Sequence, residues 1–249
     1  MAKIIAVINQ KGGVGKSTTA AAVAAGLSLK GFKVLSIDLD AQGNLSYTYG
    51  ADGKKPSILG VLIGDVKAAD AIQQTGSGDI IPSNKSLAGA DAFISDTGKE
   101  YRLKEAIEDI QTMYDYIIVD TPPALGILTV NALTACNSII VPAQADIYSL
   151  QGIEQLAETI KPVKKYCNAA LKIEGILLTR YNPRSILSRD IAEIAGQIAD
   201  KLDTRLFKTT IREAIVVKEA QISRKTLYDY APTANVTADY MSLIDELLE

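Results

Sequence analysis

The sequence predicts an α/β fold, a single domain over residues 1–249 with a mainly parallel, twisted sheet and helices on both faces. Short apolar, β-branched runs alternate along the chain with longer segments of helical periodicity, which is the order of elements in such folds. The runs are continuously apolar, which is typical of parallel strands buried on both faces. The composition, 47% hydrophobic and 22% charged, is ordinary for a globular protein, and 249 residues can bury a full core.

The elements follow one another from the N-terminus. The first apolar run predicts a strand over residues 3–8, and the alanine-rich stretch after it predicts a helix over residues 16–30 that ends at Gly31. Further apolar runs predict strands over residues 33–37, 79–81, 116–119, 138–141 and 172–178. Segments of helical pattern predict helices over residues 99–111, 125–135, 149–166 and 187–202. Residues 51–56, with a glycine, two lysines and a proline, predict a surface loop rather than a domain boundary.

Composition also excludes several kinds of chemistry. The chain contains no histidine, which excludes histidine-based triads, histidine general bases and histidine-ligated metals. Cys136 and Cys167 have neither the spacing of a disulfide framework nor that of a metal site, which favours a reducing cytoplasm. No apolar run approaches the length of a membrane span. Any reaction must therefore use carboxylates, lysines, backbone dipoles and a hard cation bound by oxygen.

The segment over residues 10–19, Gln-Lys-Gly-Gly-Val-Gly-Lys-Ser-Thr-Thr, joins the first strand to the first helix. A glycine loop in this position lets successive backbone N–H groups point at an anion, and the helix N-terminus adds its positive dipole. We expect Lys16 to reach the β- and γ-phosphates of a nucleoside triphosphate and the Ser17 hydroxyl to ligate Mg²⁺. The nucleotide-binding residues predicted in this loop are Lys11, Gly12, Gly13, Val14, Gly15, Lys16, Ser17 and Thr18.

Lys11 departs from the strict phosphate-loop pattern, which has glycine six residues before the lysine, where this chain has Gln10. A second lysine is useful if it reaches a neighbouring subunit's site and meets negative charge developing between phosphates. The run Lys-Gly-Gly-Val-Gly-Lys-Ser-Thr resembles the deviant Walker A motif of the ParA/MinD family of P-loop ATPases. The resemblance implies the P-loop NTPase fold of the deviant Walker A type. It also implies an ATP-sandwich dimer in which Lys11 contacts the nucleotide of the opposite subunit.

Acidic residues follow two of the predicted strands. Asp38 and Asp40 come at the end of the second strand, and Asp120 directly follows the strand over residues 116–119. Ligands of parallel sheets bind at this end of the strands, and an apolar strand followed by aspartate is the form of a Walker B motif, which holds Mg²⁺. The resemblance implies that Asp40 positions or activates the attacking water and that Asp38 lies near the metal. The predicted catalytic residues are Lys11, Lys16 and Asp40, and the predicted magnesium residues are Ser17, Asp38 and Asp120.

Two further segments bear on the branch of the family. Residues 120–152 resemble the Soj branch, in which this stretch is the second switch region beside the dimer interface. The loop containing Asn182 and Pro183 leans toward the MinD branch, and the resemblance implies that it contacts adenine. MinD-type members end in a basic amphipathic helix that lies on membranes. Here the polar positions of residues 240–249 are acidic, so we expect this helix to pack on the core and expect no stable membrane association.

Basic residues are concentrated in one part of the chain. Residues 161–225 carry 14 basic and 7 acidic residues, although the whole chain has a net charge of −3. This asymmetry predicts a face that could meet a polyanion, although scattered solvated helix faces would give the same counts. ParA-branch dimers bind DNA without sequence preference, yet Glu213 and Val216 stand where Soj-like proteins usually carry basic residues. The candidate DNA-binding residues are Arg184, Arg189, Arg212, Lys218, Arg224 and Lys225.

The resemblance as a whole implies a Mg²⁺-dependent ATPase switch that is slow and stimulated by a partner. ATP would draw two monomers into a homodimer that binds double-stranded DNA, and a ParB-like centromere-binding protein would stimulate hydrolysis and release. Such a cycle partitions plasmids or chromosomes and implies a nucleoid-associated protein of the cytoplasm. No helix-turn-helix segment precedes the first strand, so the resemblance is to short, Soj-type members. Two alternatives stay open: a MinD-like membrane- or cargo-positioning ATPase, and a nucleotide-dependent interaction regulator.

Overall fold

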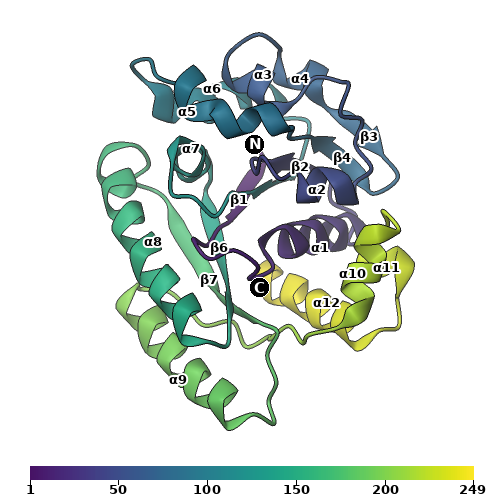
Figure 1. Ribbon diagram of the computed structural model, residues 1–249, viewed down its shortest axis with the longest axis vertical. Helices are drawn as coiled ribbons and strands as arrows, with labels where there is room; N and C mark the ends of the chain where they lie inside the picture. Colours follow the sequence, from purple (N-terminus) through teal and green to yellow (C-terminus); the bar gives the residue numbers. More distant parts are fainter.

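Seven strands form one sheet in the order β3-β4-β2-β5-β1-β6-β7 in the computed structural model, which describes residues 1–249 (Figure 1). The strands are β1 (Lys3–Val7), β2 (Val34–Asp38), β3 (Gln73–Thr75), β4 (Gly78–Ile81), β5 (Tyr116–Asp120), β6 (Ser138–Gln144) and β7 (Lys172–Thr179). All pairs are parallel except β3 with β4. The six predicted strands and the mainly parallel sheet are therefore confirmed, and β3 is an antiparallel edge strand that the sequence did not predict.

The register of the central strands brings the predicted acidic residues to one edge. Val7, the last residue of β1, pairs with Asp120 of β5, and Asp38 of β2 pairs with the same Asp120. Parallel strands that end level with one another place the loops after them at a common edge. The loop after β1, the Asp38–Asp40 segment and Asp120 therefore meet at the carboxyl end of the sheet.

Helices lie on both faces of the sheet. The α-helices are α1 (Lys16–Leu29), α2 (Asn44–Thr48), α3 (Ile58–Leu62), α4 (Ala68–Ala71), α5 (Ala90–Phe93), α6 (Arg102–Ala106), α7 (Ile127–Ala135), α8 (Ile147–Tyr166), α9 (Ile186–Lys201), α10 (Ile215–Ile222), α11 (Leu227–Tyr230) and α12 (Asn235–Leu248). Short 3-10 helices are η1 (Lys85–Gly89), η2 (Lys99–Tyr101) and η3 (Glu108–Ile110). Four predicted helices correspond to α1, α7, α8 and α9, with ends that differ by one or two residues.

The prediction of one helix over residues 99–111 is wrong, because the chain forms η2, α6 and η3 there. The side chain of Asn131 on α7 accepts a hydrogen bond from Leu103 N at 2.9 Å and donates one to Lys99 O at 2.8 Å. It thereby satisfies backbone groups at the junction of η2 and α6 that a continuous helix would pair internally.

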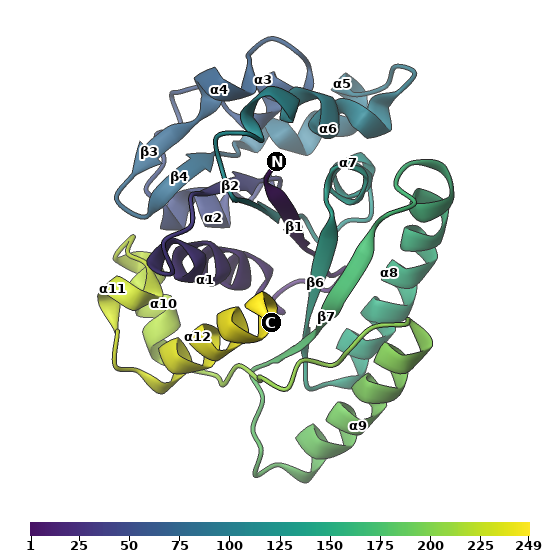
Figure 2. The ribbon, with the colours of Figure 1, turned by 180° about the vertical axis from the view of Figure 1, so that it is seen from behind.

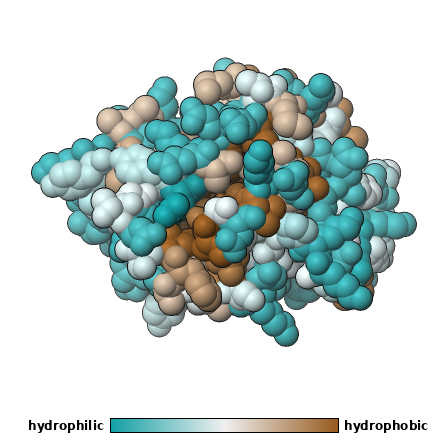
Figure 3. Space-filling view, turned by 90° about the horizontal axis from the view of Figure 1, so that it is seen from above, coloured by the Kyte–Doolittle hydropathy of each residue, from teal (hydrophilic) through white to brown (hydrophobic).

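Alternate residues of the central strand face two separate cores. Ile4 and Ala6 belong to a cluster of 42 buried residues with α3, α6, α7 and α8, whereas Ile5 and Val7 belong to one of 24 with α1 and α12. Figures 1 and 2 both show α1 and α12 side by side on one side of the sheet, with α7 and α8 on the other. Seen from above, the end of the molecule formed by α3–α6 has an apolar area surrounded by polar side chains (Figure 3).

The C-terminal helix α12 packs on the core as predicted. It buries Val236, Tyr240, Leu243 and Ile244 in the same cluster as α1. Gly26 of α1 permits this close approach, because a Cβ there would lie only 2.8 Å from Cγ1 of Ile244. No helix of the protein has both the length and the apolar character that crossing a bilayer requires.

Candidate functional site

The loop between β1 and α1 has a backbone that its glycines make possible. Gly13 and Gly15 adopt φ of 78° and 90°, in the left-handed region that favours glycine. Gly15 is the N-cap of α1, so the loop ends at the positive end of a 14-residue helix. A Cβ on Gly12 or Gly13 would meet no atom within 4 Å, which shows that the loop borders open space.

That space is a cavity of about 520 Å³ at the carboxyl end of the sheet. Its volume lies within the range of small-molecule and cofactor sites. Six segments line it: the phosphate loop with the start of α1, the Asp40 segment, α2, the loop after β5, the loop after β7, and α10. The lining residues are Gly12, Gly13, Gly15, Lys16, Ser17, Thr18, Asp40, Gln42, Asn44, Tyr47, Thr48, Pro123, Arg180, Lys218, Gln221 and Ile222. The structure thus brings together most of the predicted loop residues and Asp40.

Lys16 is a buried ammonium group at this cavity, with 7% of its surface exposed. Its Nζ donates to the carbonyl oxygen of Lys11 at 3.1 Å, within the loop itself. Burial lowers the pKa of Lys16, while the nearby carboxylates of Asp120 and Asp40 oppose that change. Because a phosphate would both pair with this ammonium and replace lost hydration, the position suits an anionic ligand.

Asp38 holds the polypeptide around the site rather than lining the cavity. One of its oxygens accepts from Asp40 N at 3.0 Å, and the other accepts from Ser46 N at 2.8 Å and Ser46 Oγ at 2.6 Å. Burial raises the pKa of Asp38 to about 6, although the Ser46 hydrogen bonds work against that change. Asp38 therefore fixes the start of α2 and the backbone of Asp40, which lines the cavity.

Asp120 is a fully buried carboxylate, and neither of its oxygens has a hydrogen-bond partner. Burial raises its pKa well above the usual value, and Asp38 raises it further, whereas Ser17 and Lys16 lower it. An unpartnered buried carboxylate is costly, and a hard cation is the ligand that would satisfy it. Asp120 and the Ser17 hydroxyl therefore fit a Mg²⁺ ion that also binds phosphate oxygens.

We expect Asp120→Asn to stabilise the protein in a chelating buffer without nucleotide, and increasingly so from pH 5 to pH 8. Because the folded state raises the pKa of Asp120, its carboxyl favours folding while protonated, and that contribution is lost as pH rises above about 4. Asparagine does not titrate, so the variant avoids this loss, which is about 1.4 kcal/mol for each unit by which folding raises the pKa. Thermal unfolding across pH measures it, with exposed Asp70→Asn as the control. A variant less stable than the wild type at pH 8 would contradict the assignment.

Lys11 lies against its own chain. Its Nζ contacts Asp146 Oδ1 and Oδ2, both at 2.7 Å, and lies 5.9 Å from the centre of the Tyr148 ring. Asp146 is also the N-cap of α8, accepting from Ser149 N at 3.0 Å. Burial alone would raise the pKa of Asp146, but the Lys11 and Ser149 hydrogen bonds outweigh it and lower the pKa. Asp146 could not be predicted from the sequence, because its only local signal is an Asp-x-x-Ser capping pattern.

A second cavity of about 130 Å³ shares Gly15, Thr18, Arg180, Lys218 and Gln221 with the first. Its other walls are Val14, Thr179, Tyr240, Val217 and the segment Ile211, Arg212, Glu213 and Ala214. Asn182 and Pro183, predicted to contact adenine, line neither cavity. The Asn182 amide oxygen accepts from Arg184 N at 3.0 Å instead, so it is used in a local turn. In this cavity the segment over residues 211–214 lies beside Val14 and Gly15 of the phosphate loop, whereas the sequence suggested only a DNA surface for that segment.

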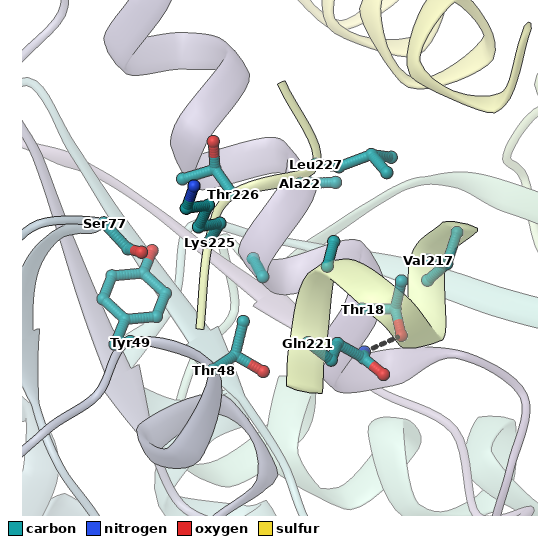
Figure 4. Close-up of a pocket in the computed structure, with 12 residues that line it drawn as sticks. Thr18, Ala22, Thr48, Tyr49, Ser77, Val217, Gln221, Lys225, Thr226 and Leu227 are labelled. Atoms are coloured by element: carbon teal, nitrogen blue, oxygen red, sulfur yellow. Dashed lines mark hydrogen bonds between the residues drawn. The ribbon is translucent and has the colours of Figure 1, made fainter. Parts of the chain in front are cut away.

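The helix α10 contributes to the site although nothing in the sequence predicted it there. Lys218, Gln221 and Ile222 line the larger cavity. Figure 4 shows Gln221 on α10 pointing at Thr18, and its Nε2 donates to Thr18 Oγ1 at 3.0 Å. Their contact separates the nucleotide-sized cavity from a small, mainly apolar one of about 30 Å³ behind it.

The six predicted DNA-binding residues come from separate elements. Arg184 and Arg189 lie at the start of α9, whereas Lys218, Arg224 and Lys225 lie on or after α10, which is distant from α9 in Figures 1 and 2. Arg212 is paired with Asp239 through two bonds of 2.7 Å. The guanidinium of Arg224 lies 4.8 Å from the centre of the Tyr47 ring, and Lys225 is exposed.

Comparison with known proteins identifies the family. A family model described as an AAA domain matches residues 2–173. The sporulation initiation inhibitor protein Soj of Bacillus subtilis is 38% identical, with 99% of this chain and 98% of that protein covered. The chromosome partitioning protein ParA of Caulobacter vibrioides is 34% identical, with 99% and 94% covered. The structure of a cobyrinic acid a,c-diamide synthase from Mycobacterium smegmatis, with bound ATP analogue and magnesium, has a TM-score of 0.86 and 35% identity, with 100% and 95% covered. The chain therefore belongs to the ParA/Soj family of P-loop ATPases.

Proposed function

We propose that this protein is a Mg²⁺-dependent ATPase switch that partitions DNA, with one domain over residues 1–249. The observation that carries the proposal is the cavity lined by a glycine loop and the buried ammonium of Lys16, with the buried, unpartnered carboxylate of Asp120 close enough to act on the Lys16 charge. These groups supply backbone donors, a cation and a metal ligand, as triphosphate binding requires. The relatives named Soj and ParA support partitioning as its use.

The residues of the site divide the chemistry among them. Lys16 binds the β- and γ-phosphates, and Ser17 and Asp120 would hold the Mg²⁺, with Asp38 keeping the surrounding backbone in place. A bound Mg²⁺ would lower the charge repulsion that an attacking water meets. Asp40, whose Oδ1 accepts from Gln42 N at 3.0 Å, orients that water. Lys11 leaves Asp146 and crosses to the phosphates of a second subunit, which makes dimerisation depend on ATP.

The ATP-bound dimer then binds DNA without sequence preference, on the nucleoid. Of the predicted DNA-binding residues, Lys218 lines the nucleotide cavity, and Arg224 and Lys225 follow the same helix, so nucleotide and DNA sites are adjacent in this proposal. Two copies of this group in one dimer double the number of phosphate contacts. A ParB-like centromere-binding protein stimulates hydrolysis and returns the dimer to monomers.

Binding to a random-sequence fluorescent duplex tests the proposal, with Mg²⁺ and ATP, ADP or no nucleotide, across a salt series. We expect DNA binding with ATP but not with ADP or without nucleotide, because only the dimer presents both basic groups. The affinity for DNA should fall steeply as the salt concentration rises. Lys225→Ala should weaken binding and reduce the salt slope by about one unit for each phosphate that is no longer neutralised. Lys54→Ala, an exposed lysine in the predicted surface loop, is the matched control.

The outcomes also separate the alternatives. ATP-driven dimers that ignore DNA but sediment with anionic liposomes would favour the MinD-like positioning ATPase. Dimers that bind DNA but release almost no phosphate, with or without a ParB-like protein, would favour an interaction regulator. Failure to bind ATP would contradict the proposal as a whole.

A further inference from the structure

Gln221 and Thr18 lie where three cavities of this protein meet. Both residues line the cavity of about 520 Å³, the adjoining one of about 130 Å³ and the small apolar one behind them. They come from different elements, since Thr18 lies in the first turn of α1 and Gln221 in the last turn of α10. Their hydrogen bond of 3.0 Å therefore joins the phosphate loop to a helix 203 residues away in the chain (Figure 4).

The direction of this bond decides what the Thr18 hydroxyl can do. A threonine hydroxyl has one proton to donate and two lone pairs to accept with. Because the Gln221 amide donates to Thr18 Oγ1, one lone pair is used and the hydroxyl proton remains free for another acceptor. Thr18 borders the cavity beside Lys16 and Ser17, where phosphate oxygens are the expected acceptors. Accepting one hydrogen bond also polarises a hydroxyl toward donating the next.

A second contact connects the end of α10 to α2, another element that lines the same cavity. Arg224 directly follows the C-cap of α10, and its guanidinium lies 4.8 Å from the centre of the Tyr47 ring on α2. Arg224 adopts a φ of 50°, which is unusual for a residue with a side chain and sets it toward that ring. Tyr47 lines the cavity next to Ser46, the residue that holds Asp38. The helix α10 is thus connected to both the phosphate loop and the Asp38–Asp40 segment.

We propose that Gln221 is a positioning residue that orients the Thr18 hydroxyl as a donor to the bound nucleotide, and that α10 thereby senses nucleotide occupancy. This inference rests on the proposed nucleotide site. Nucleotide binding strengthens the Gln221–Thr18 bond and fixes α10, which carries Lys218 and precedes Arg224 and Lys225. The state of the phosphate loop is therefore transmitted to the basic residues mainly through this side-chain hydrogen bond, with the Arg224–Tyr47 contact as a second connection.

A double-mutant cycle tests the first part with the full chain and the nonhydrolysable analogue AMPPNP plus Mg²⁺. Gln221→Ala should raise the Kd about fivefold, the worth of one ordinary hydrogen bond. In the Thr18→Val background, which keeps the shape of the side chain, the same change should have no further effect. Gln221→Glu keeps the size but cannot donate, so its Kd should rise at least as much. Glu219→Ala, on α10 but outside all three cavities, should leave the Kd unchanged.

Hydrogen exchange tests the second part. AMPPNP should slow exchange over residues 215–222 in the wild type, and this slowing should be lost in Gln221→Ala while residues 10–19 remain protected. Three results would overturn this inference but leave the proposed function standing. They are an equal effect of Gln221→Ala on the Kd in both Thr18 backgrounds, a wild-type Kd in Gln221→Glu, and full protection of α10 from exchange in Gln221→Ala. A wild-type protein that binds no AMPPNP would instead overturn the proposed function, and the inference with it.

Discussion

Lys16→Ala is expected to abolish measurable binding of Mg²⁺·ATP. The Lys16 ammonium is buried at the cavity and has only one hydrogen bond, to the Lys11 carbonyl, so a phosphate would be its main partner. Removing one partner of a buried charge pair costs about 2–5 kcal/mol or more, which corresponds to an affinity loss of roughly 30-fold to several thousand-fold. Titration calorimetry with AMPPNP measures this change in affinity directly.

Two controls make that experiment specific. Lys16→Met keeps most of the side-chain stem and removes the charge, so it should lose binding as completely as alanine. Lys30→Ala changes the lysine at the other end of α1, which forms an exposed ion pair with Asp245, and should bind as the wild type does. Thermal unfolding without nucleotide checks that each variant is folded. Micromolar affinity in Lys16→Ala would remove this lysine from the site.

Lys11→Ala is expected to bind ATP but to remain monomeric, and consequently to lose DNA binding. In the proposed dimer this lysine is buried against the opposite subunit's phosphates, so its loss should weaken dimerisation roughly 30-fold or more. Multi-angle light scattering with AMPPNP measures the oligomeric state, and AMPPNP affinity measured at low protein concentration checks that the monomer still binds. An ATP-dependent dimer of this variant at wild-type concentrations would refute the cross-subunit role.

Asp146→Asn is the matched variant, because it removes the charge that holds Lys11 in the monomer. Asparagine is as good an N-cap as aspartate, so α8 should keep its first turn. Freed from its ion pair, Lys11 should promote dimerisation at lower protein concentration than in the wild type. A variant that dimerises less readily would show that Asp146 takes part in the dimer rather than restraining the monomer.

The phosphate loop and the parallel sheet could be predicted because their signals are local. The positive-φ glycines, the lysine and the hydroxyl residues lie within one short segment, and each of the six predicted strands has its own apolar run. The antiparallel strand β3 could not be found in this way, since Gln73–Thr75 is short and entirely polar. Its position is decided by pairing with β4, which is a tertiary contact.

The rest of the candidate site depends on contacts between distant parts of the chain. Nothing near Lys11 in the sequence indicates Asp146, and nothing near Thr18 indicates Gln221. The adenine contact of Asn182 stays a prediction, because an amide after a strand predicts base recognition equally well whether it faces a ligand or closes its own turn. Basic composition predicts a face that could meet a polyanion, and which of the residues near α9, near α10 and paired with Asp239 would form it depends on the fold.

The Lys11–Asp146 ion pair has a consequence for how ionic strength acts on the proposed cycle. Its two side chains are 28% and 31% exposed, so dissolved salt screens their attraction, whereas a lysine enclosed between two subunits is screened much less. Rising salt therefore loosens the restraint on the monomer while it weakens attachment of the dimer to DNA. The two steps have opposite ionic responses, so the loosened restraint offsets a small part of the fall in DNA binding that rising salt causes.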